Sequence, residues 1–144
     1  MKEIFVDTHY FVARINPKRS MVHTAAKAIA PKLKNIHLVT TESILIELMN
    51  YLAEYPPSMR QAVANLTRKV LDNSWVETIP HTREALLAGL ELYESRLDKG
   101  YSLTDCISMN EMHKPAHHRR ADARQSFHAR RFQHFDLKSH PHES

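Results

Sequence analysis

Apolar positions along the first 112 residues follow two spacings, one typical of buried strands and one typical of helices. Short apolar runs at residues 2–6, 36–39 and 75–79 predict three strands. Elsewhere apolar residues recur every three or four positions, which predicts helices over residues 9–14, 20–33, 41–55, 59–71, 82–97 and 102–109. In the helix over 82–97 one face carries Leu86, Leu90, Tyr93 and Leu97, and we expect Tyr93 in the core.

Strands that alternate with helices are typical of a parallel sheet with helical crossovers, so the sequence predicts an α/β sandwich. The pattern stops after Met112, and from His113 onward the chain contains no Val, Ile, Met, Trp or Tyr. We therefore expect one domain over residues 1–112. Residues 113–144 form an atypical tail, rich in His and Arg, for which no secondary structure is predicted.

The positive charge of the chain is confined to this tail. Residues 1–112 contain as many Asp and Glu as Lys and Arg, so the formal net charge of +4 arises entirely in residues 113–144, beside most of the 11 histidines. A His-rich basic tract can bind Zn²⁺ or Ni²⁺ or contact phosphates. The spacing of His113, His117 and His118, however, is common by accident in a sequence of such biased composition. The charge therefore does not by itself indicate nucleic-acid binding.

The compartment follows from what the sequence lacks. Cys106 is the one cysteine, so no internal disulfide can form and a reduced, cytosolic environment is expected. The N-terminus does not resemble a secretory signal, and no apolar run approaches the roughly 18–20 residues of a membrane span. We expect a cytoplasmic protein without a membrane partner.

Asp7 directly follows the first predicted strand. Ligands of parallel α/β sheets collect outside the carboxyl ends of the strands, which places Asp7 at such a crevice. The alternative is an Asp that only caps the following helix.

Glu47 lies inside a predicted helix, with Ile44, Leu48 and Tyr51 at three- and four-residue spacing. A carboxylate on a mostly apolar face costs several kcal/mol of desolvation unless it is paired or binds a cation. The alternative is a Glu at the edge of that face with its carboxylate in water.

Asp105 follows Ser102 by three residues, which resembles a capping box with Asp in place of the usual Glu or Gln. A helix N-terminus holds a carboxylate firmly and favours its charge, so capping is compatible with function. Together the three carboxylates suggest a site for a hard cation such as Mg²⁺ or Mn²⁺, which prefer oxygen ligands.

These residues lie in three segments that resemble the signature blocks of PIN domains of the VapC toxin type: residues 4–8 (IFVDT), 40–50 (TTESILIELMN) and 101–106 (YSLTDC). Their order and separation match too, over about residues 1–112. The resemblance implies a three-layer α/β/α sandwich with a central parallel sheet and Mg²⁺- or Mn²⁺-dependent endoribonuclease activity. It assigns Asp7, Glu47 and Asp105 as catalytic, metal-binding carboxylates. Asp98 is a weaker metal candidate, with a solvated helix-end charge as the alternative.

The tail departs from the family pattern. Members of the family continue with a strand that carries a fourth Asp and with a final strand, and nothing similar follows Met112. Residues 117–135, back-translated with permissible codons and read one nucleotide later, can give a segment similar to that ending. A frameshift is therefore one explanation of the tail. Asp122 and Asp136 lie in other contexts, so loss of the fourth carboxylate predicts impaired activity.

Two functions follow from these observations. The first is a metal-dependent endoribonuclease, the toxin of a toxin-antitoxin pair, with RNA as substrate and a cognate antitoxin or a second copy as protein partner. The alternative is a non-catalytic PIN-like module that acts through protein–protein binding. Metal-dependent turnover separates the two.

Overall fold

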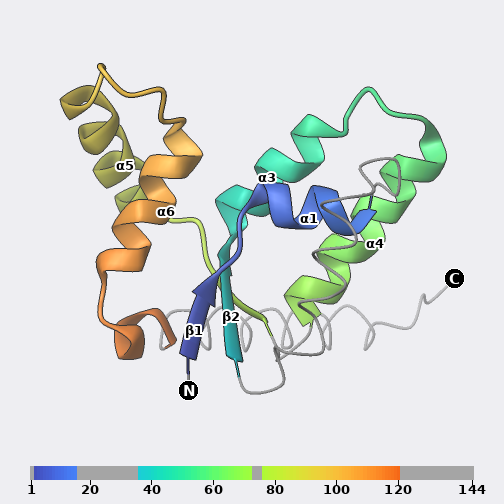
Figure 1. Cartoon of the computed structure of the whole chain (residues 1–144), viewed down its shortest axis with the longest axis horizontal. Helices are drawn as coiled ribbons and strands as arrows, with labels where there is room; N and C mark the ends of the chain where they lie inside the picture. The colour runs from blue at the N-terminus through green and yellow to red at the C-terminus, as the bar shows by residue number, and fades with distance from the viewer. Residues whose placement is uncertain (1, 16–35, 73–75, 121–144) are drawn as a thin grey trace, which may run out of the picture.

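The computed structural model describes residues 2–15, 36–72 and 76–120 (Figure 1). The helix expected over residues 20–33 and the part of the tail from residue 121 onward lie outside the described residues. So does Trp75, the first residue of the strand expected over residues 75–79.

A three-stranded parallel sheet forms the centre of the fold. Its strands are β1 (Lys2–Phe5), β2 (Ile36–Thr41) and β3 (Val76–Ile79), in the order β1-β2-β3. The register pairs Ile4 with Leu38 and Leu38 with Val76, which places these apolar side chains on one face because side chains alternate along a strand. All three strands end at the same edge of the sheet.

Helices cover both faces of this sheet (Figure 1). On one side lie α1 (Thr8–Ile15), α3 (Glu42–Tyr51) and α4 (Pro57–Asp72). On the other lie α5 (Arg83–Ser95) and α6 (Leu103–His113). The predicted α/β/α sandwich with a parallel sheet is therefore confirmed. No helix in the described segments is long and apolar enough to cross a membrane.

The largest apolar core lies between the sheet and α1, α3 and α4. Phe11, Leu38 and Leu48 are each at most 2% exposed at its centre. Val39 points to the opposite face, where Cys106 and Ile107 of α6 are also buried. Thr41 caps α3 and Thr82 caps α5, each through a side-chain oxygen that accepts the backbone N–H three residues on. The helix starts expected at these threonines are thus correct.

The apolar face expected to be buried on α5 is exposed, so the prediction for Tyr93 is wrong. Tyr93 is 42% exposed and Leu97 is 76% exposed, whereas Ala85 and Gly89 are buried. The physical reason is the close approach of α5 and α6. A helix that packs at short distance turns its small residues to its neighbour, and the larger side chains then lie outside the contact.

A charged cluster lies on the α5–α6 side of the sheet, beyond the apolar contacts. It consists of Glu3, His37 and Glu77, one from each strand, with Arg119 and Arg120 from a short helical segment after α6. Arg119, 7% exposed, pairs with Glu3, and Arg120 lies 3.5 Å from Glu3 and 3.9 Å from Glu77. Burial, and the neighbouring Arg120, lower the pKa of Arg119. Residues 113–120 are thus tied to β1.

Gly89→Ala tests the close contact between α5 and α6. A Cβ at this position would lie 2.5 Å from Ile107 Cγ1, so the two helices would have to move apart. We expect a loss of about 1–3 kcal/mol in unfolding free energy, although Ala favours a helix by about 1 kcal/mol over Gly. Gly100→Ala, where no atom lies within 4 Å, is the matched control in urea denaturation. Equal stability of the two variants would contradict the described packing.

Arg119→Met tests whether the charged cluster holds residues 113–120 against the sheet. Removing one partner of a buried ion pair leaves the other uncompensated, so we expect a loss of about 3 kcal/mol in unfolding free energy. Arg68→Met, on the exposed surface of α4, is the control and is expected to change stability by at most about 0.5 kcal/mol. If both variants unfold at the same urea concentration, Arg119 does not make the contacts described.

Candidate active site at the carboxyl ends of the strands

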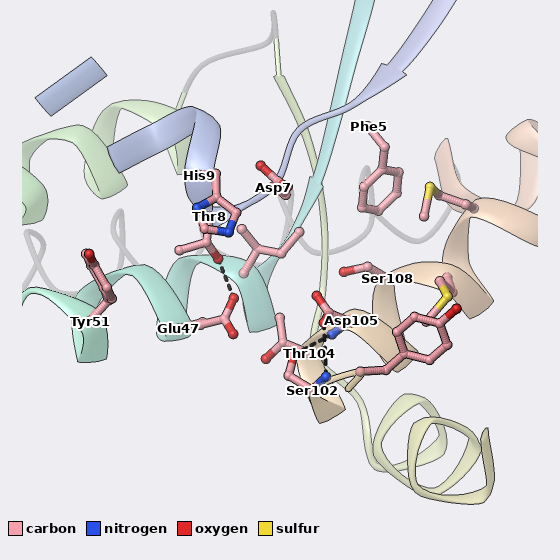
Figure 2. Close-up of a pocket in the computed structure, with 14 residues that line it drawn as sticks. Phe5, Asp7, Thr8, His9, Glu47, Tyr51, Ser102, Thr104, Asp105 and Ser108 are labelled. Carbon is pink, nitrogen blue, oxygen red and sulfur yellow. Dashed lines mark hydrogen bonds between the residues drawn. The ribbon is translucent and has the colours of Figure 1, made fainter. Parts of the chain in front are cut away.

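A cavity of about 560 Å³ opens where the strands end, between the start of α1, the middle of α3 and the first turns of α6 (Figure 2). This volume lies within the roughly 300–1,000 Å³ of ordinary ligand sites. Its wall is formed by residues of both apolar and polar type: Phe5, Asp7, Thr8, His9, Ile44, Glu47, Tyr51, Tyr101, Ser102, Thr104, Asp105, Ser108, Met109 and Met112. The three carboxylates expected from the sequence therefore line one cavity.

Asp7 directly follows β1 and begins the turn into α1. Its Oδ1 accepts a hydrogen bond of 3.1 Å from the backbone N–H of Tyr10, as a helix-capping residue does. Its exposed side chain also lines the cavity. Capping and a place in the pocket, the two alternatives at this position, are therefore combined in one residue.

Glu47 lies on α3 between buried Ile44 and Leu48 and is itself half-buried. The hydroxyl of Thr8 donates a hydrogen bond to Glu47 Oε2, which connects α1 to α3 across the pocket (Figure 2). This bond offsets part of the cost of taking a carboxylate out of water. Glu47 is thus directed into the cavity and fixed there.

Asp105 closes the capping box expected at the start of α6. The backbone N–H of Ser102 donates to Asp105 Oδ2 at 3.0 Å, and the backbone N–H of Asp105 donates to the Ser102 hydroxyl at 3.0 Å. Figure 2 shows Asp105 and Glu47 extending from α6 and α3 into the same space, with Asp7 nearby. The cap holds the Asp105 carboxylate at the cavity wall.

The donor chemistry of the cavity fits a hard cation. Each carboxylate uses one oxygen in the hydrogen bonds above, which leaves the other to a ligand. Ser108 Oγ, in a residue 8% exposed, lines the cavity and has no hydrogen-bond partner among the described residues. A buried hydroxyl without a partner indicates a group that an incoming ligand would satisfy.

The spacing of these donors is wider than that of a closed metal site. Within residues 2–15, 36–72 and 76–120, no three His, Cys, Asp or Glu side chains converge closely enough to hold an ion together. An ion that retains part of its water shell, as Mg²⁺ does, bridges wider spacings. The described spacing therefore fits an ion bound partly through water.

The remaining candidates lie outside this cavity. Asp98 is exposed, does not line the pocket, and pairs with Arg96 at 3.2 Å. Cys106 is fully buried, and burial, with a further contribution from Asp105, raises the pKa of its thiol. The uncharged thiol therefore dominates, and Cys106 packs as a small apolar residue.

The sequence assigned no role to several residues of the wall. Thr8 is identified from the sequence only as part of the segment over residues 4–8, yet its hydroxyl orients Glu47. Ser108 follows Asp105 by three residues, one helical turn, and only the fold shows that both side chains face the cavity. Tyr51, which the sequence places on the apolar face beside Glu47, lines the cavity and is 47% exposed.

Comparison with known proteins agrees with this architecture. No protein-family model and no curated protein matches the sequence. Among solved structures, the chain is similar to VapC20 of Mycobacterium tuberculosis, a toxin that cleaves the sarcin-ricin loop. The two share 19% sequence identity with a TM-score of 0.64, over 75% of this chain and 79% of that chain. The resemblance to PIN domains of the VapC type is thereby confirmed at the level of the fold.

Ser102→Ala tests the cap that holds Asp105. Loss of the hydroxyl acceptor is expected to lower the unfolding free energy by about 1 kcal/mol. For a domain of this size that corresponds to a fall of about 2–4 °C in Tm, measured by thermal unfolding. Ser95→Ala is the control, because this exposed hydroxyl bonds only within its own helix. An unchanged Tm for Ser102→Ala would show that the capping box does not stabilise α6.

Proposed function

We propose that this chain is a metal-dependent endoribonuclease that hydrolyses RNA phosphodiester bonds, the toxin component of a toxin-antitoxin pair. The observation that supports it most is the meeting of Asp7, Glu47 and Asp105 in one cavity, although they come from elements far apart in the sequence. The fold shared with a VapC toxin supports the same activity. RNA as substrate and an antitoxin as protein partner belong to this proposal.

In this function Asp7, Glu47 and Asp105 would hold Mg²⁺ or Mn²⁺. Such an ion supplies Lewis-acid chemistry, because it neutralises charge on a phosphate oxygen and makes water more acidic. Thr8 keeps the Glu47 carboxylate turned into the cavity, and the Ser102 cap does the same for Asp105. The Ser108 hydroxyl donates a hydrogen bond to an oxygen of the bound phosphate.

The set of carboxylates in the described wall also limits the activity. The fourth acidic residue of the family has no counterpart among the described residues of the wall. Three carboxylates neutralise less charge than four, and the binding of the ion is therefore weaker. We propose an enzyme with impaired turnover, which needs a higher metal concentration than a four-carboxylate site would.

The alternative function is a non-catalytic module that acts through protein contacts. The observations that favour it are the wide spacing of the carboxylates and the exposed apolar side chains of α5, which include Leu87 at 51% and Leu90 at 42%. Such a module would bind an antitoxin or a second copy and would show no metal-dependent turnover.

RNA cleavage by the purified chain separates the two functions. We expect cleavage with Mn²⁺ or Mg²⁺ that stops with EDTA and falls about 100-fold or more in Asp7→Asn, Glu47→Gln and Asp105→Asn, the loss typical of an electrostatic group in an active site. Glu54→Gln, exposed beyond the end of α3, is the matched control and is expected to keep full activity.

Thermal unfolding of each variant would show that the fold is intact. Cleavage that persists in EDTA, or that is equal in Asp7→Asn and Glu54→Gln, would contradict the assigned site. A folded chain with no cleavage at any Mn²⁺ concentration would support the binding module instead.

A further inference from the structure

The cavity wall combines strong negative charge with exposed aromatic rings. Three of its side chains are carboxylates, and no residue of the described wall is Lys or Arg. His9 is the one wall residue that can carry positive charge, and it does so only when protonated. A phosphodiester that enters the cavity therefore finds no fixed positive charge on the described wall. Contacts between protein and phosphate alone would not hold RNA there.

The aromatic rings offer a different kind of contact. Tyr51 and Tyr101 line the cavity and are 47% and 37% exposed, whereas Phe5 is half-buried and packs against the core. Large rings that stay exposed in a concave site are available to a flat ligand. The π-face of an unpaired nucleobase is such a ligand, and stacking on Tyr needs no charge.

The two tyrosines flank the carboxylates from different elements. Tyr51 follows Glu47 by one turn of α3, and Figure 2 shows it on the side of the pocket away from Asp105. Tyr101 directly precedes Ser102, whose backbone N–H is fixed to Asp105 at 3.0 Å. A phosphate held at the carboxylates would thus have one ring available on the α3 side and one on the α6 side.

Both positions are restrained before any ligand binds. The ring of Tyr51 packs against that of Tyr55, with centroids 6.5 Å apart and an angle of 32° between the planes. The backbone beside Tyr101 is held by the capping box of α6. These contacts reduce the conformational entropy lost on binding, at the side chain of Tyr51 and at the backbone beside Tyr101.

We propose that Tyr51 and Tyr101 bind RNA by stacking on the bases that flank the cleaved phosphate. The substrate is then an unpaired RNA segment, because bases inside a duplex have both faces covered by their neighbours. Stacking tolerates any base, so these two residues select for unstacked structure rather than for sequence. This inference rests on the proposed endoribonuclease function, since it takes the carboxylate cavity as the site of the phosphate.

The test measures binding separately from cleavage. Fluorescence anisotropy of a labelled single-stranded oligoribonucleotide is recorded with the full chain, with Ca²⁺ in place of Mg²⁺. We expect Tyr51→Ala and Tyr101→Ala each to weaken binding about tenfold, the loss of one base–aromatic stack. The Phe variants at both positions keep the ring and are expected to bind within about twofold of the original chain, on the same basis.

Tyr93→Ala is the matched control, because Tyr93 is equally exposed at 42% but lies on α5 and does not line the cavity. Abasic sites placed through the oligonucleotide provide a second readout. Removing a base that stacks weakens binding to the original chain but not to the double Ala variant. A fully paired RNA of the same sequence is expected to compete poorly.

The outcomes separate this inference from the function on which it rests. Cleavage by the original chain, with Tyr51→Ala and Tyr101→Ala binding as well as Tyr93→Ala, overturns the stacking and leaves the nuclease intact. Ring-dependent binding without cleavage in Mg²⁺ or Mn²⁺ supports the stacking while the nuclease proposal fails. Absence of any binding by the folded chain overturns both.

Discussion

The parallel order of the three strands is the constraint on which the candidate site depends. Parallel strands end at one edge, so the fold gathers Asp7, Glu47 and Asp105 there. Each is stabilised by a local donor, namely a backbone N–H for Asp7 and Asp105 and the Thr8 hydroxyl for Glu47. The donors to Asp7 and Asp105 are local, whereas the donor to Glu47 lies on another helix, so each carboxylate is oriented separately. Such a site gains from a cation that lies between them.

The parts of this arrangement that are local could be predicted from the sequence. A short apolar run, a capping Ser and a carboxylate on an apolar face each have a signature of a few residues, and these predicted the strands and the positions of the three acids. The burial of α5 could not be predicted in this way. The same apolar spacing fits a face that packs and a face that is exposed, and the contact of Gly89 with α6 decides which occurs. The roles of Ser108 and Tyr101 likewise depend on which surfaces meet across the cavity.

At the opposite end of the sheet, charge is compensated by a different means. β1 lies at the edge of the described sheet, and Glu3 near its start pairs with Arg119, whose guanidinium also donates to the carbonyl oxygen of Glu111 at 3.2 Å. The same short strand therefore carries a structural ion pair at one end and leads into Asp7 at the other. Composition alone does not reveal this, because Arg119 belongs to a segment rich in basic residues and nothing in the sequence distinguishes it from the others. The position of β1, and with it that of Asp7, therefore depends on the ion pair of Glu3 as well as on the turn into α1.

Binding of Mn²⁺ followed by electron paramagnetic resonance tests the central claim most directly, because the signal of the free ion reports binding without substrate or turnover. The account predicts that the folded chain takes up a single Mn²⁺, that Asp105→Asn and Asp7→Asn each abolish uptake, and that Asp72→Asn, exposed at the end of α4, does not. Uptake that is unchanged in Asp7→Asn and Asp105→Asn would show that the cavity is not the metal site. No uptake by the intact chain would show that the three carboxylates do not form one.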